Sequence, residues 1–172
     1  GGLITLTAQD EIGVLGSGSD TDLEFAASSS VNVSSTGTGN IDLDGLGALT
    51  LSDVDTSDGS ITVDAGGAIT ATDVVAAGGS GDSVTLSTTT GGVVATLVTG
   101  ADAVSITATA GDITVGAITA TAGTLGVTAT AGSINDAADD NTVDFTAGGL
   151  ITLTAQDEIG VLGSGSDTDL EF

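Results

Sequence analysis

Residues 104–123 read VSITATAGDITVGAITATAG, and this stretch decides the fold. An apolar–polar–apolar triplet (VSI) is followed, after the corner TAGD, by a second triplet (ITV) and then by a third apolar residue, Ile118. Alternation with a period of two is typical of half-buried strands. Glycine in the corner allows positive φ without a steric penalty. The stretch therefore predicts short strands joined by tight corners, with their apolar side chains on one side.

The same pattern recurs along the chain at steps of 18 to 27 residues, with a mean near 21. The first apolar pairs are Leu23/Phe25, Ile41/Leu43, Ile61/Val63, Val84/Leu86, Val104/Ile106, Leu125/Val127, Val143/Phe145 and Leu170/Phe172. A second pair follows each first pair by six to nine residues in most repeats. A third apolar position comes three residues later, at Val54, Val74, Leu97 and Ile118.

One such repeat cannot bury its own apolar side, but stacked repeats can. Each strand then pairs in parallel with its equivalents above and below, about 4.8 Å away. The pattern predicts an all-β fold, a parallel β-helix (β-solenoid) of about 21 residues per coil, with Phe25, Leu43 and Val63 in one interior column. A right-handed winding is favoured by the rule for parallel crossovers. An antiparallel sandwich of short strands is the alternative architecture.

A much longer repeat surrounds the short one. The 25 residues GGLITLTAQDEIGVLGSGSDTDLEF occupy Gly1–Phe25 and return unchanged at Gly148–Phe172, 147 positions later. Loop residues match as well as strand residues, so packing alone does not explain the identity. The sequence predicts a continuous solenoid with residues 1–147 as one tandem unit of seven coils and residues 148–172 as the start of the next unit. The two copies are expected in equivalent places.

The composition excludes several functions. The chain has no Lys, Arg, His or Cys, and its 24 carboxylates give a net charge of −24. Nucleic acids and anionic membranes recruit Lys and Arg, so neither is expected as a partner. No apolar run is long enough to span a membrane. Most general bases and nucleophiles are missing, which predicts that the protein is not an enzyme.

Carboxylates that stack without a neighbouring cationic side chain predict candidate sites for Ca2+, the one cofactor that the sequence suggests. Asp53 and Asp73 each precede a third apolar position, so stacking would bring them within about 5 Å. A hard cation would relieve their repulsion. The candidates, including those in the corners GSGSDTD and DVDTSDG, are Asp20, Asp22, Asp53, Asp55, Asp58 and Asp73. Neither corner matches a known calcium-loop spacing, and a hydrated acidic surface is the alternative interpretation.

Two other interpretations of surface residues are less favoured. Carboxylate groups such as Asp53/Asp55/Asp58 and Asp139/Asp140 could serve glycoside hydrolysis, but supporting groups are missing and solvated turn acids explain them. Thr-x-Thr pairs such as Thr128/Thr130 could order water in the manner of an ice-binding face. They do not share one register in the sequence, and outward β-branched strand residues explain them.

Strings such as ITLTAQDEIGV, GSITVDAGGAITATDV and VSITATAGDITVGAITATAG resemble the β-helical repeats of filamentous-haemagglutinin-type adhesins. They are also similar to autotransporter passenger domains and giant repetitive bacterial surface proteins. The resemblance implies a right-handed parallel β-helix exported to the surface of a Gram-negative-type cell, with a role in adhesion or in a surface fibre. It brings no catalytic residues to this chain.

The sequence thus predicts a structural or adhesive fibre segment, extracellular or on a cell surface. Its expected partners are neighbouring repeats of the same chain or filament, with divalent cations and lateral self-association as further possibilities. The alternative function is a Ca2+-dependent module that binds glycan or ice.

Overall fold

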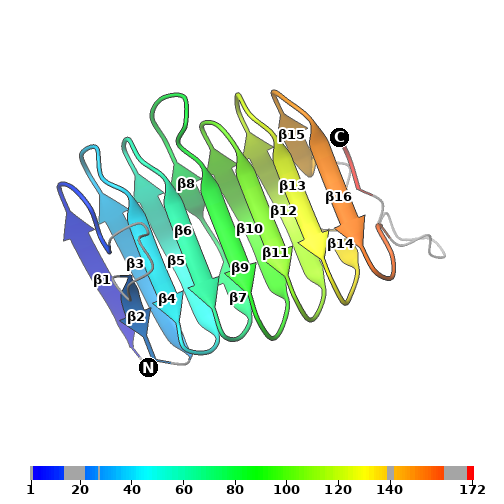
Figure 1. Ribbon diagram of the computed structural model, residues 1–172, viewed down its shortest axis with the longest axis horizontal. Helices are drawn as coiled ribbons and strands as arrows, with labels where there is room; N and C mark the ends of the chain where they lie inside the picture. The colour runs from blue at the N-terminus through cyan, green and yellow to red at the C-terminus, as the bar shows by residue number, and fades with distance from the viewer. Residues whose placement is uncertain (1, 14–21, 27, 139–141, 161–169) are drawn as a thin grey trace.

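The computed structural model describes residues 2–13, 22–26, 28–138, 142–160 and 170–172. The described chain winds as a coil, and its strands lie side by side in two layers along the long axis (Figure 1). Every regular element among the described residues is a strand, and the strands pair in parallel. Accordingly, the described residues contain no helix that is long and apolar enough to cross a membrane. The prediction of an all-β parallel β-solenoid is confirmed.

Successive strands alternate between two sheets, named here sheet A and sheet B, except that β7 and β8, and likewise β14 and β15, follow one another within sheet A. Sheet A contains β1 (Leu3–Ala8), β3 (Ser29–Ser35), β5 (Leu49–Thr56), β7 (Ile69–Ala71), β8 (Val74–Ala76), β10 (Val93–Gly100), β12 (Ile113–Ala120), β14 (Ile134–Asp136) and β15 (Phe145–Ala147). Sheet B contains β2 (Leu23–Phe25), β4 (Ile41–Gly45), β6 (Ile61–Ala65), β9 (Val84–Thr88), β11 (Val104–Ala108), β13 (Leu125–Ala129) and β16 (Ile151–Ala155).

The register in sheet B shows how the sequence builds the core. Ile106 of β11 pairs with Leu86 on one side and with Val127 on the other, so equivalent residues lie about 21 positions apart. These inward side chains are fully buried, whereas Ser105 and Thr107 point outward. Every coil thereby covers the apolar residues of its neighbours, and the columns of Val, Ile and Leu form one continuous core.

Sheet A carries the third apolar column at a bend. Val54, Val74, Val98 and Ile118 stack there and are buried. The prediction of Leu97 in this column is wrong: Leu97 lies on the bend and is 37% exposed. In the run VVATLV, apolar residues occupy both odd and even positions along the strand. Alternation alone therefore does not determine which of them point inward.

Phe25 also differs from its predicted position. It faces inward and is buried, but it pairs with Gly45, while Leu23 takes the place beside Leu43. The predicted column of Phe25, Leu43 and Val63 is therefore shifted by one inward position. The physical reason is volume, because a phenyl ring fits over the column that continues from Gly45 to Ala65.

The seventh predicted coil begins elsewhere. Phe145, expected over Val127 in sheet B, lies over Ile118 in sheet A. The strand over β13 is β16, with Ile151 on Leu125, Leu153 on Val127 and Ala155 on Ala129. The small side chain of Ala129 is matched in size by that of Ala155. This match explains why ITLTA (residues 151–155), rather than VDF (residues 143–145), continues sheet B.

As a result, the two copies of the 25-residue segment are not in equivalent places. Ile4–Ala8 pairs with β3 in sheet A, whereas the same residues in the second copy, Ile151–Ala155, pair with β13 in sheet B. The second copy thus lies half a winding out of phase with the first. The expectation of equivalent places is wrong for this chain.

Buried hydroxyls close two of the corners. Thr56 Oγ1 donates to the Gly59 carbonyl at 2.7 Å, and Thr88 Oγ1 donates to the Gly91 carbonyl at 2.9 Å. Gly91 has φ of 94°, a backbone conformation that residues with a side chain rarely adopt. Each threonine ends a strand with its side chain inside the coil.

Replacing Thr56 by Val is expected to lower the free energy of unfolding by about 1–2 kcal/mol, since the shape is kept but the buried hydrogen bond is lost. Urea titration measures the change. Thr62→Val, on the outer face of β6, is the matched control and should shift the value by less than about 0.5 kcal/mol. Equal losses in both variants would contradict the role of the corner hydroxyl.

Candidate functional site

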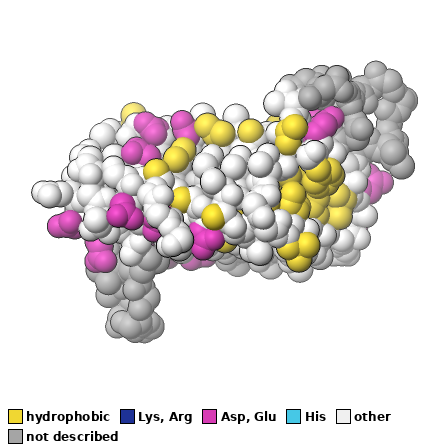
Figure 2. Space-filling model, turned by 90° about the horizontal axis from the view of Figure 1, so that it is seen from above, with side chains coloured by type: hydrophobic (Ala, Val, Ile, Leu, Met, Phe, Trp, Pro, Cys, Tyr) yellow, Lys and Arg dark blue, Asp and Glu magenta, His cyan; other side chains and the backbone are white. Residues whose placement is uncertain are grey.

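Carboxylates stack on the outer face of sheet B near β2. Glu24, Asp44 and Asp64 occupy one column, since Glu24 pairs with Asp44 and Asp44 pairs with Asp64. Asp42 lies beside them, and burial raises the pKa of its carboxyl, with further increases from the charges of Asp22, Asp64 and Asp44. Figure 2, which views the corners from above, likewise shows acidic side chains gathered toward the end that carries β1. This acidic face repels like charge and attracts cations.

Asp53 and Asp73 are neighbours, as the sequence predicts. Val54, which follows Asp53, pairs with Val74, which follows Asp73, and the Val54 N–H donates to the Asp73 carbonyl at 2.9 Å. Asn32 Nδ2 donates to Asp53 Oδ2 at 3.3 Å, so an amide separates Asp53 from further acids on that side. Asp73 Oδ1 is buried without a hydrogen-bond partner among the described residues.

The other calcium candidates are dispersed. Asp55 accepts a hydrogen bond from Ser34 Oγ at 3.2 Å, Asp58 is exposed in a corner, and Asp22 lies near Asp42. Asp20 and the pair Asp139/Asp140 lie outside the described residues. Over the described part of the chain, no three of these candidates bring their oxygens within 4.8 Å of one another. Calcium binding at these residues stays a prediction.

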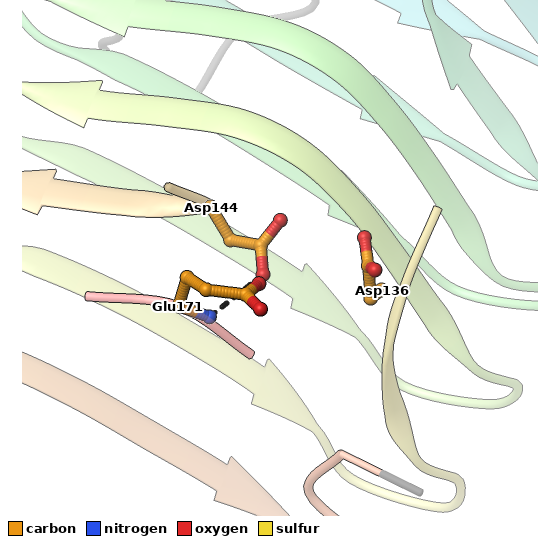
Figure 3. A group of neighbouring side chains, drawn as sticks. All are labelled: Asp136, Asp144 and Glu171. Atoms are coloured by element: carbon orange, nitrogen blue, oxygen red, sulfur yellow. Dashed lines mark hydrogen bonds between the residues drawn. The ribbon is translucent and has the colours of Figure 1, made fainter. Parts of the chain in front are cut away.

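The described residues do bring three other carboxylates together, at the end of the coil that carries β14 and β15. Oxygens of Asp136, Asp144 and Glu171 lie within 4.8 Å of one another (Figure 3). Asp136 ends β14, and Asp144 directly precedes β15. The Glu171 N–H donates to Asp144 Oδ2 at 3.0 Å, and the Glu171 carbonyl accepts from the amides of Asp144 and Phe145. We call this group the acidic triad.

Asp144 is the most buried member of the triad, with 4% of its surface exposed. Burial raises the pKa of its carboxyl, the hydrogen bond from the Glu171 backbone lowers it, and the charge of Asp136 raises it again, for a net increase. Asp144 therefore binds a proton more readily than an exposed aspartate does. The triad can also hold a hard cation, because Ca2+ takes carboxylate and carbonyl oxygens and completes its shell with water.

Sequence reasoning missed the triad because it assigned Val143 and Phe145 to sheet B. One signal was available: Asp144 precedes a residue of the third apolar column, as Asp53 and Asp73 do. The three aspartates thus share one position of the winding. Glu171 reaches this position only because the second copy of the repeat continues onto sheet A.

The pH dependence of stability tests the charge on Asp144. Because its folded pKa lies above the unfolded value, the native state binds more protons in the window just above pH 3.8, and stability falls as pH rises through it. Asp144→Asn keeps an acceptor for the Glu171 amide and removes the charge. We expect Tm at pH 7 to rise by about 2–4 °C, equivalent to about 1 kcal/mol.

The same melts with chelator and with added Ca2+ distinguish proton binding at Asp144 from cation binding at the triad. A cation held there would raise the Tm of the native chain in Ca2+ and leave that of Asp144→Asn unchanged. Asp10→Asn, which removes one exposed charge that belongs neither to the triad nor to the calcium candidates, is the control. A lower Tm for Asp144→Asn in chelator would contradict the repulsion assigned to Asp144.

Hydroxyl side chains cover the rest of the outer face of sheet B. Ser87, Thr107, Thr128 and Thr154 form one column. The adjacent column is interrupted, because Gly126 lies between Ser105 and Thr152. The sequence analysis assigned the Thr-x-Thr pairs to different strands of the winding. The column that these threonines share in the structure could therefore not be recognised from the sequence.

A shallow hollow of about 470 Å³ lies at the corners beside β8, lined by small side chains that include Ala77, Ser80, Thr99 and Thr121. Among the described residues that line it, none is ionisable.

Comparison of the chain with protein-family models, with curated proteins and with solved structures gave no match.

Proposed function

We propose that this chain is a segment of a stiff structural rod, a tandem array of 147-residue units, extracellular or on a cell surface, with a structural or adhesive role. The supporting observation is the uninterrupted stack. From β2 to β16 each strand of sheet B pairs with the next, and the core columns continue through all of them. Nearest-neighbour contacts of this kind add up along an axis, so length can grow without a larger core.

The repeated segment supports an array in particular. Gly148–Phe172 begins a second unit with the residues that begin the first, and it continues the coil after β15. The partner of each unit is accordingly the next unit of the same chain or filament. The net charge of −24 keeps rods apart, and divalent cations that bridge two rods would favour lateral association.

The resemblance to secreted bacterial repeats motivates the proposed location. An exposed rod also benefits from a chain that lacks Lys and Arg, because trypsin-type proteases have no cleavage point in it. The proposal assigns no catalytic activity to the rod.

Chains of one, two and three units test the proposal by small-angle scattering. A rod adds about 31–34 Å of length per unit at constant cross-section, since each coil advances about 4.8 Å. A cross-section that grows with unit number, as in a compact particle, would contradict the rod.

A second candidate function, Ca2+-dependent binding of a glycan or ice, is favoured by the acidic triad alone. Calorimetric titration with Ca2+ tests it on the native chain and on Asp144→Asn. Saturable heat lost in the variant supports this function, and the absence of heat in the native chain contradicts it.

A further inference from the structure

We infer that successive units join half a winding out of phase, so that sheet A of one unit continues as sheet B of the next. The interface is the open end of the coil made by β16, Ile159 and Glu171–Phe172. Its occupant is the segment that follows Phe25 in the unit, equivalent to Ser29–Gly45. This inference rests on the proposed tandem array and specifies how its units connect.

The repeated segment has the same inward face in both sheets. In sheet A, Ile4 lies over Val31, Leu6 over Val33 and Ala8 over Ser35, which places these three side chains toward the core. In sheet B, the same residues at Ile151, Leu153 and Ala155 lie over Leu125, Val127 and Ala129, again toward the core. The segment therefore turns the same apolar side chains toward the core in both sheets. A change of sheet does not alter which of its residues point inward.

The two copies pair through opposite edges of the segment. The first copy pairs with β3, which follows it along the axis. The second copy pairs with β13, which precedes it. Both pairings are parallel and in register, so a copy inside an array can make both at once. A unit placed half a winding further thus has a partner at each edge.

The residues beyond the strand repeat the same offset. Ile12 bridges Ile41 in sheet B, whereas its equivalent Ile159 bridges Ile134 in sheet A. The Glu171 carbonyl accepts hydrogen bonds from sheet A at Phe145, whereas Glu24 pairs with Asp44 in sheet B. The half-winding offset therefore holds along the described parts of both copies.

The repeated phenylalanine has different surroundings in the two copies. Phe172 stacks on Phe145, with ring centroids 5.6 Å apart, and is 69% exposed. Phe25, its equivalent, is 5% exposed because β4 covers it with Gly45. In an array the ring would lie between a copy of Phe145 and a copy of Gly45, where glycine leaves room for it.

The offset has a consequence for recognition. The acidic face of Glu24, Asp44 and Asp64 lies on sheet B in this unit and would lie on the sheet A side in the next. A rod built in this way presents the same face alternately on its two sides and repeats after two units. It can contact neighbouring rods on both sides with one set of residues.

The test uses the whole chain extended after Phe172 to two complete units. No native cysteine competes with labels. One spin label replaces the second-unit equivalent of Thr107, and the other replaces either Thr99 of sheet A or Thr107 of sheet B in the first unit. Pulsed electron paramagnetic resonance then measures one label-to-label distance for each pair. Which of the two distances is shorter depends on whether the second unit is offset by half a winding. For the inferred offset the axial separation is about 34 Å in the Thr99 pair, seven coils, and about 31 Å in the Thr107 pair, six and a half coils.

We expect a narrow distribution for each pair, with the Thr99 pair shorter because both labels then lie on one side of the rod. Narrow distributions with the Thr107 pair shorter would overturn the offset and leave the rod intact. Broad distributions for both pairs would overturn the offset and the tandem rod together. The Thr99–Thr107 distance within the 172-residue chain is the control that the first unit is folded.

Discussion

Ile106→Asp is expected to unfold the coils around β11. Ile106 is fully buried between Leu86 and Val127, and the described chain contains no Lys, Arg or His to neutralise a carboxylate there. A buried charge without a partner costs several kcal/mol, so we expect a loss of more than about 4 kcal/mol in the free energy of unfolding. Circular dichroism during urea titration measures it.

The adjacent residue provides the control. Thr107→Asp adds the same charge one position along the strand, on the outer face of sheet B. We expect a change of less than about 1 kcal/mol, since the new charge is solvated and its immediate neighbours in the column, Ser87 and Thr128, are uncharged. Similar losses for the two variants would show that the alternation of inward and outward residues is not what holds the strand.

Deletion of one whole coil is expected to leave a folded protein. Removing residues 104–124 joins Ala103 to Leu125, so Leu125 takes the place of Val104 over Val84. The corner at Gly132 then takes the place of the corner at Gly111. Since coils contact only their neighbours, we expect a loss of about 1–2 kcal/mol, the share of one coil in a typical stability.

Removal of only residues 104–112 should do far more damage, although fewer residues are lost. It would place β12, a strand of eight residues, over the five residues of β9 in sheet B, and neither strand belongs to the repeated segment that pairs in both sheets. We expect loss of the cooperative transition in thermal melts for the shorter deletion and its retention for the longer one. The reverse order would refute winding by whole coils.

The sequence was sufficient for the fold because each regular coil repeats the same apolar alternation. Val104/Ile106 and Leu125/Val127 could be aligned without ambiguity, and the structure pairs them as predicted. The prediction was wrong at Leu97, where apolar residues occupy both alternating sets of positions along the strand. It was also wrong at Phe145, where two apolar–polar–apolar triplets could each have formed the next strand of sheet B. Side-chain volume determines the position of Phe25. The alternation of apolar and polar residues does not take side-chain volume into account.

The candidate site was less accessible to sequence reasoning. The adjacency of Asp53 and Asp73 followed from their common place before the third apolar column. The acidic triad did not follow, since Asp136 and Glu171 meet only through the change of sheet in the second copy. That change depends on pairing between distant strands, which no local motif encodes.

Parallel stacking of equivalent strands is the central claim, and interstrand nuclear Overhauser effects in the 172-residue chain test it most directly. The account predicts backbone contacts from Ile106 to both Leu86 and Val127, in the pattern of parallel strands. Contacts from Val104 to Gly100 in the pattern of an antiparallel hairpin between β10 and β11, without those to Leu86 and Val127, would contradict it.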